Sequence, residues 1–267
     1  MQKIVVLLCC VAMLAVSGEV SAQGRKRGDM DGDGGVTIND VTLLVKYMLD
    51  CRSGWGTTQI AQQLKAYADV DCDSQVTLSD VSTLADVLLE RHEAIDLGLS
   101  VRWATMNVGA TSVVDFGDYY AWGEIAPKSS YTEDNYVYYG EGAYQSIGNS
   151  IGGTRYDVAK AAWGDGWHLP TLIDINELKN KCTWEAVSLC GVAVYKVTGP
   201  SGNSIYLPLA GYKTGNETKF AGEECYSWCG MKPSTASAAY CLYGQNYTGN
   251  WSANRSYGFT IRPVRNK

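Results

Sequence analysis

Histidine is scarce in this chain of 267 residues, which contains His92 and His168 and no other histidine. This scarcity excludes metal sites built from several imidazoles and leaves two candidates for histidine acid–base chemistry. Basic side chains are also few, because 22 lysines and arginines stand against 28 acidic residues, for a formal charge of −6. A chain without a basic excess lacks the positive face that nucleic-acid binding requires. We therefore expect no nucleic-acid partner.

Long apolar runs are equally rare, and the one clear example lies at the N-terminus. Lys3 precedes an uncharged apolar run over residues 4–16, and Val20-Ser21-Ala22 offers small residues for cleavage. This pattern predicts a secretory signal peptide at residues 1–22, whose apolar run is too short to span a bilayer. We expect no transmembrane segment and a protein that is secreted to the extracellular space or the cell surface.

Cysteine is plentiful by comparison, with nine residues, of which seven remain after removal of residues 1–22. Export permits disulfides, and an odd number leaves at least one thiol free or paired with another chain. The Cys225-x-x-x-Cys229 spacing lacks the second ligand pair of a tetrahedral metal site, so disulfides or buried thiols are favoured. The sequence leaves the pairing open among Cys51, Cys72, Cys182, Cys190, Cys225, Cys229 and Cys241.

The negative charge is concentrated in one part of the chain. Residues 23–93 contain 12 acidic and 7 basic side chains, whereas residues 94–267 contain 15 and 14. Within the acidic part, residues 29–40 and 69–80 align without gaps, 40 residues apart, with Asp at loop positions 1, 3, 5 and 12. Ca²⁺ takes six to eight oxygen ligands, and a 12-residue loop directs side chains at these positions and the carbonyl of position 7 onto one centre. The spacing predicts two Ca²⁺ ions, with the ligands Asp29, Asp31, Asp33, Gly35 and Asp40 in the first loop and Asp69, Asp71, Asp73, Gln75 and Asp80 in the second.

An amphipathic helix is predicted after each loop. Apolar residues recur at i, i+3, i+4, i+7 and i+8 from Val41 and again from Val81. Few residues precede the first loop after residue 22, so each unit is predicted as a loop followed by a helix, with a third helix around Leu64 between them. We expect the two helices to pack face to face. The predicted faces are Val41, Leu44, Val45, Met48 and Leu49 in the first helix and Val81, Leu84, Ala85, Leu88 and Leu89 in the second.

This duplicated arrangement over residues 28–91 resembles a type I dockerin module. The resemblance implies that two calcium loops order the module and that its helices dock onto a cohesin-like receptor. In that family the residues at loop positions 10 and 11, often a Ser/Thr pair, read the partner. Here these positions hold Ile38-Asn39 and Leu78-Ser79, which leaves the identity of the partner open.

Residues 94–267 are predicted to form a second, mixed and strand-rich domain, so that the fold class is α+β with several domains. Helices are predicted at residues 156–163 and from Pro170 through Lys181, with Thr171 as N-cap. Strands are predicted at residues 99–104, 119–122, 192–197, 205–209, 226–230, 238–243 and 257–262, and a long loop at 123–155.

Several phrases in this part resemble the FISUMP, or major paralogous, domain family of exported bacterial proteins. They run in order from Asp96 to Arg265 and include DLGLSVRWATMNVGA, WGDGWHLPT, YKVTGPSGNSIYLPLAGY and YGFTIRPVR. The resemblance implies a C-type-lectin-like fold over residues 95–267. A fold does not determine a function.

Catalytic motifs are sparse in the C-terminal domain. It contains no Gly-x-Ser-x-Gly elbow, and its cysteines do not match the spacing of a formylglycine-generating enzyme. His168, next to Trp167, is typical of a packed histidine, and Glu124 and Asp165 are candidates for a glycosidase pair. We predict no catalytic residue. Candidates for ligand binding are Trp251, Tyr136, Tyr138 and Tyr139, whereas Trp103, Trp163, Trp167 and Trp228 are expected in the core.

The sequence thus predicts an exported, non-catalytic protein of three segments: a signal peptide (1–22), a dockerin-like calcium module (23–93) and a FISUMP domain (94–267). The module attaches the chain to a cohesin-like receptor, and the C-terminal domain binds a glycan or a surface protein. One alternative is a member of a polysaccharide-degrading assembly whose C-terminal domain is an O-glycosyl hydrolase. Another is a fimbrial or surface structural adhesin.

Overall fold

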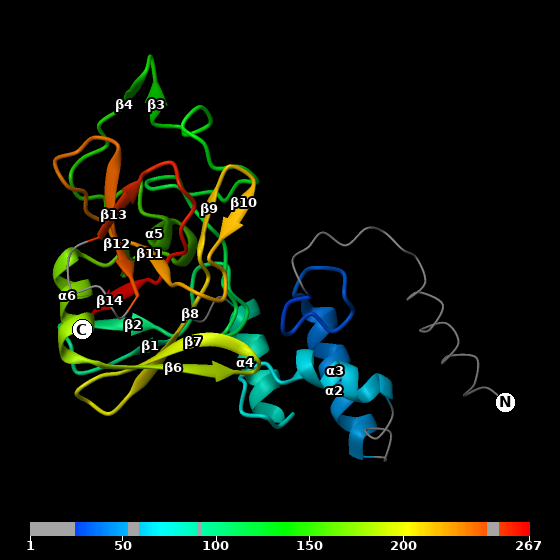
Figure 1. The fold of residues 1–267 in the computed structure, drawn as a ribbon. Helices are drawn as coiled ribbons and strands as arrows, with labels where there is room; N and C mark the ends of the chain where they lie inside the picture. The colour runs from blue at the N-terminus through cyan, green and yellow to red at the C-terminus, as the bar shows by residue number, and fades with distance from the viewer. Residues whose placement is uncertain (1–24, 53–58, 90–91, 245–250) are drawn as a thin grey trace.

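The computed structural model describes residues 25–52, 59–89, 92–244 and 251–267. The predicted signal peptide lies outside these residues. A helical N-terminal part is followed by a strand-rich part with two small helices, an α+β arrangement as the sequence predicts (Figure 1). Among the described residues, every helix is too short or too polar to cross a membrane.

The N-terminal part consists of helices α2 (Ile38–Arg52), α3 (Gln59–Ala68) and α4 (Leu78–Leu88). Helix α4 begins with a capping box, because the Thr77 hydroxyl accepts a hydrogen bond from the backbone and the Asp80 carboxylate accepts one from the Thr77 amide. Helices α2 and α4 pack against each other through Leu44 and Leu84, which are fully buried. Burial of a leucine contributes about 2 kcal/mol, so this contact is a principal source of stability for the small helical part.

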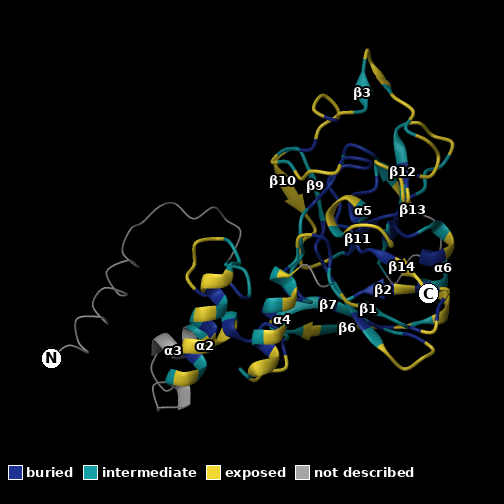
Figure 2. Ribbon diagram, turned by 180° about the vertical axis from the view of Figure 1, so that it is seen from behind, coloured by how far each residue is buried: buried dark blue, intermediate teal, exposed yellow. Residues whose placement is uncertain are grey.

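The buried stripe of these helices is narrower than the sequence predicts. Leu44, Val41 and Val81 pack in the core as expected, whereas Val45, Leu49 and Leu89 are exposed (Figure 2). The prediction that these three side chains are buried was wrong, because two short crossing helices share only a narrow strip of contact. The remaining apolar side chains are left facing solvent.

The strand-rich part is built from short antiparallel sheets (Figure 1). A four-stranded sheet has the order β1-β2-β14-β5, so the last strand of the chain lies between β2 and β5. Two further sheets are meanders, β6-β7-β8 and β11-β12-β13, and two are hairpins, β3-β4 and β9-β10. The elements are β1 (Ala94–Ile95), β2 (Val101–Ala104), β3 (Tyr139–Gly140), β4 (Ala143–Tyr144), α5 (Val158–Trp163), β5 (Trp167–His168), α6 (Leu172–Lys181), β6 (Thr183–Leu189), β7 (Val192–Thr198), β8 (Ser204–Pro208), β9 (Tyr212–Thr214), β10 (Glu217–Lys219), β11 (Tyr226–Trp228), β12 (Ala238–Tyr243), β13 (Trp251–Asn254) and β14 (Val264–Asn266).

Most predicted elements of this part are confirmed, including helix α6 with its capping box at Thr171. Two predicted strands are wrong. Residues 257–262 form single bridges to Tyr120, Lys213 and Ser227 rather than a ladder with one partner. Residues 119–122 likewise form one bridge, Tyr120 to Phe259. In both segments the alternating apolar residues are buried among several other segments. This burial produces the same two-residue period as a strand. The sequence also missed β6, β13 and the hairpin β3-β4.

Arg262 joins four segments inside the C-terminal core. It is fully buried, and its guanidinium donates to Asn107 Oδ1 at 2.8 Å, the Ala104 carbonyl at 3.0 Å and the Tyr206 carbonyl at 2.8 Å. Its backbone amide donates to Ser227 Oγ at 2.9 Å. Burial lowers the pKa of Arg262 to about 9. A buried cation with these acceptors fixes β2, β8 and β11 around the end of the chain.

The helical part contacts the C-terminal part through its second loop rather than its first. Arg27 donates to the Cys190 carbonyl at 3.1 Å and to the Asp69 carbonyl at 2.7 Å, and its own carbonyl accepts from Thr111 at 3.0 Å. Cys72 is buried against apolar side chains around Val194 of β7. Helix α4 accordingly lies nearest to the strands in Figures 1 and 2.

Candidate metal centre

The two aspartate-rich loops close in the same way. In the first, Asp40 Oδ1 accepts hydrogen bonds from the Met30 amide at 2.7 Å and the Asp31 amide at 3.2 Å. In the second, Asp80 Oδ1 accepts from the Val70 amide at 2.7 Å and the Asp71 amide at 3.2 Å. Both position-12 carboxylates are fully buried. Each carboxylate therefore connects the first turn of its helix to the beginning of its loop.

Side chains of the loops converge as the spacing predicts, but the two sets differ. Ligand atoms of Asp29, Asp31 and Asp40 lie within 4.8 Å of one another in the first loop. In the second loop the corresponding group is Asp69, Asp71 and Asp73. The structure thus gathers positions 1, 3 and 12 in one loop and positions 1, 3 and 5 in the other.

The remaining predicted ligands are held by the loop backbone. Asp33 Oδ1 accepts from the Gly35 amide at 2.8 Å, and Asp73 Oδ1 accepts from the Gln75 amide at 2.7 Å. These bonds form the same turn at positions 5 to 7 of each loop. That the backbone carbonyls of Gly35 and Gln75 bind the metal stays a prediction.

One buried oxygen in the second loop has no partner. Within the described residues, Asp69 Oδ1 makes no hydrogen bond, although the residue is buried. Burying a carboxylate oxygen without compensation is costly, and a hard cation such as Ca²⁺ takes oxygen ligands of this kind. The donor set therefore fits calcium.

Repulsion among the loop carboxylates also favours a bound cation. Desolvation and then the negative charges of Asp40, Asp33 and Asp29 raise the pKa of Asp31. Desolvation, with a contribution from Asp71, also raises the pKa of Asp80. A cation at the centre of each loop would offset both the desolvation and the like-charge repulsion.

Both loops need a left-handed backbone at positions 4 and 6. The φ angles are +80° at Gly32 and +90° at Gly34 in the first loop. In the second loop the same positions hold Cys72 at +65° and Ser74 at +71°. Because a Cβ atom is unfavourable in this region, the second loop is the more strained. The two residues of the second loop that bear this strain are Cys72 and Ser74.

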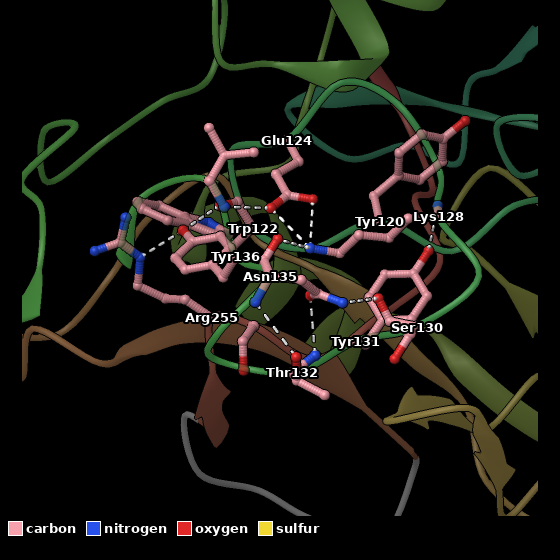
Figure 3. A network of polar contacts seen from close by, with 12 residues as sticks. Tyr120, Trp122, Glu124, Lys128, Ser130, Tyr131, Thr132, Asn135, Tyr136 and Arg255 are labelled. Carbon is pink, nitrogen blue, oxygen red and sulfur yellow. Dashed lines mark hydrogen bonds and ion pairs between the residues drawn. The ribbon is translucent and has the colours of Figure 1, made fainter. Parts of the chain in front are cut away.

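The acidic candidates of the C-terminal part lie in different settings. Glu124 is buried, accepts from Lys128 Nζ at 2.9 Å and from the Val137 amide at 2.9 Å, and so holds its own loop in place (Figure 3). Asp165 is exposed and pairs with Lys160 at 3.2 Å. His168 lies in β5 and contacts the Leu169 carbonyl and Asn266. Each has a structural partner.

The aromatic candidates divide into core and surface residues. Trp103, Trp167 and Trp228 are buried as predicted, whereas Trp163 is half-buried and stacks on His92. Tyr136, predicted as a binding residue, is instead buried, because its hydroxyl donates to the Trp122 carbonyl at 2.6 Å (Figure 3). The other candidates keep exposed surface: Trp251, Tyr138 and Tyr139.

Comparison with known proteins identifies the helical part. Residues 27–89 match the family model of the dockerin type I domain. No curated protein and no solved structure matches the chain. The resemblance of residues 95–267 to FISUMP domains and to the C-type-lectin-like fold therefore stays a prediction.

The paired loops allow the backbone strain to be measured. Ser74→Gly should raise the free energy of unfolding by about 1 kcal/mol, because glycine adopts positive φ without a Cβ clash. The matched substitution Gly34→Ser should lower it by about as much, since a Cβ at Gly34 meets nothing within 4 Å and reports the backbone alone. Urea unfolding of the full chain at saturating calcium measures both. Unchanged stability in both variants would contradict strain at position 6.

Proposed function

Because the chain contains a dockerin type I domain, we propose that it is an exported attachment protein. Two Ca²⁺ ions order residues 23–93, helices α2 and α4 dock onto a cohesin-like receptor, and residues 94–267 are displayed as a binding module. The observation that carries this proposal is the exposed apolar face repeated on α2 and α4. Export is supported by the predicted signal peptide at residues 1–22.

The calcium step rests on the aspartate loops. In the first loop the metal would be held by Asp29, Asp31, Asp33, Asp40 and the Gly35 carbonyl, and in the second by Asp69, Asp71, Asp73, Asp80 and the Gln75 carbonyl. Bound Ca²⁺ would neutralise the clustered carboxylates and fill the position beside Asp69 Oδ1, which has no partner among the described residues. Because an unfolded chain does not present this geometry, binding stabilises the fold.

Calorimetric titration of the full chain should report two calcium ions. Asp29→Ala and Asp69→Ala should each remove one, because each deletes the first ligand of its loop. At calcium concentrations 100-fold above the dissociation constant, each lost ion should lower the stability by about 2.7 kcal/mol.

The control is Asp134→Ala, which removes one exposed negative charge outside both loops. It should keep both ions. Absence of calcium uptake at millimolar concentration by the parent chain would contradict the calcium step.

The docking step rests on two matched stripes of residues that are exposed except for the half-buried Ala85. On α2 the stripe is Ile38, Thr42, Val45 and Leu49, and on α4 and its C-cap it is Leu78, Ser82, Ala85 and Leu89. Both follow i, i+4, i+7, i+11, which keeps them on one helix face. Ile38 is 71% exposed and Leu78 is 69% exposed. Each occupies loop position 10, where dockerins read their partners.

This face leaves the contact with the C-terminal part undisturbed. That contact uses Arg27, Asp69 and Cys72, whereas Ile38 and Leu78 stay solvent-exposed in the full chain. A receptor therefore has access to α2 and α4 while residues 94–267 remain attached. An apolar residue at position 10 of each loop favours a receptor with an apolar surface at this point.

Substituting the two apolar anchors should abolish docking. The variant carrying both Ile38→Asp and Leu78→Asp should lose at least about 30-fold in affinity, since each buried apolar anchor contributes about 2 kcal/mol. The measurement is surface binding of the full chain to a panel of purified cohesin domains, with calcium and with chelator. Lys65→Asp, at an exposed position of α3, is the control and should bind as the parent does. Equal binding by the double variant would exclude this face.

For the C-terminal part, Trp251 is the supported candidate for ligand contact. Its ring lies on the edge strand β13, packs at 5.0 Å from Tyr243 and stays 37% exposed. A flat, supported and exposed ring suits the C–H face of a sugar or an apolar side chain of a surface protein. A C-type-lectin-like fold of the FISUMP kind is proposed here on the sequence phrases.

A glycan array probed with the full chain tests this role. Glycan-bound signal should fall at least about fivefold in Trp251→Ala, because loss of a stacking ring removes roughly 1–3 kcal/mol. Trp163→Ala serves as a comparison, since that ring stacks on His92 instead. Product release from any bound glycan, or binding unaffected by Trp251→Ala, would overturn the binding role assigned to this residue.

A further inference from the structure

The two calcium loops differ in one chemically meaningful way. Position 4 is Gly32 in the first loop and Cys72 in the second, and both adopt a left-handed backbone. A side chain at such a position is unfavourable, and cysteine contributes nothing to a calcium site made of oxygen ligands. Calcium binding alone therefore does not explain Cys72.

A second strained cysteine lies directly opposite. Leu189 and Val192 pair at the end of the hairpin β6-β7, which leaves a two-residue turn of Cys190 and Gly191. Their φ angles are +52° and +78°, as the type I′ turn of a hairpin requires. The first position of this turn favours Asn, Asp or Gly. Cys190, like Cys72, occupies a backbone position for which cysteine is poorly suited.

The two cysteines meet across the contact between the helical and strand-rich parts. Both side chains belong to one apolar cluster at this contact. Cys190 Sγ also donates to Asp69 Oδ2 at 3.8 Å, and Arg27 holds the Cys190 carbonyl at 3.1 Å. The turn is thus anchored on both sides against the second calcium loop.

We propose that Cys72 and Cys190 form a disulfide that joins the calcium module to the C-terminal domain. The half-exposed Cys190 thiolate attacks a small-molecule disulfide and releases one thiol, which gives a mixed disulfide. Cys72 then attacks the mixed disulfide at Cys190 and displaces the second small-molecule thiol. This completes the bond between the two parts of the protein. Two cysteine thiols are oxidised, the small-molecule disulfide is reduced to two thiols, and these thiols carry the two protons.

The bond would fix the direction in which α2 and α4 face the receptor. It closes the chain between residues 72 and 190, a segment that includes the connection between the two parts. Among the described cysteines, Cys225, Cys229 and Cys241 are buried. Cys182 is half-buried and is the matched control.

The test is peptide mapping of the folded full chain. The protein is equilibrated with oxidised glutathione in calcium buffer, alkylated, and digested with trypsin. A peptide pair linking Cys72 to Cys190 is expected, and a reductant should release it. Because no lysine or arginine separates Cys182 from Cys190, Cys182→Ser makes the assignment unambiguous and should retain the link. The linked form should also melt at least about 5 °C higher than the reduced form.

The outcomes separate clearly. Cys72→Ser and Cys190→Ser should each abolish the linked peptide. Cys72→Ser should leave Cys190 as a glutathione adduct that no second cysteine resolves, and Cys190→Ser should leave Cys72 as a thiol that is alkylated. Alkylation of both Cys72 and Cys190 in the oxidised parent chain, or a glutathione adduct on Cys190 without the link, would overturn the proposal. Since the oxidant is supplied and no receptor is needed, a negative result here is independent of the docking and export proposals.

Discussion

The structure of the N-terminal part depends on two buried carboxylates, Asp40 and Asp80. Each accepts backbone hydrogen bonds from the first residues of its loop and from the threonine that precedes its helix, at 2.7 Å from Thr37 and 2.7 Å from Thr77. A buried acceptor of this kind joins the loop and the helix into one unit. The helix cannot start elsewhere without releasing the loop, so the arrangement of the loop aspartates and the position of the apolar faces are set together.

Duplication of this unit gives two equivalent loops, but the rest of the chain uses them differently. The second loop packs on the hairpin β6-β7 through Cys72 and Asp69, and Arg27 bridges the two parts. The second loop is consequently the one with left-handed non-glycine residues and with a buried carboxylate oxygen, Asp69 Oδ1, that lacks a partner among the described residues. Of these residues, Cys72 and Asp69 lie at the contact with the C-terminal part, whereas Ser74 is exposed.

The sequence predicted what local rules determine. The repeated aspartates placed the loops, and Thr171 placed the start of α6. Prediction from the sequence failed where one residue or segment contacts several others that are distant in the chain. Alternation over residues 257–262 arises from burial among three neighbours, and Arg262 looked like part of a family phrase although it holds four segments together. No local pattern signals such hubs.

The exposed stripes on α2 and α4 show a second way in which local sequence patterns were insufficient. Helical periodicity identified the apolar residues correctly but assigned all of them to one buried face. Leu44 and Leu84 satisfy the core, and the i, i+4, i+7, i+11 set that begins at Ile38 or Leu78 remains outside. Apolar residues on two sides of a short helix exceed what folding alone requires. Their repetition at equivalent positions of both units is therefore best explained by a partner that reads α2 and α4, while the second loop keeps its own contact with the strands.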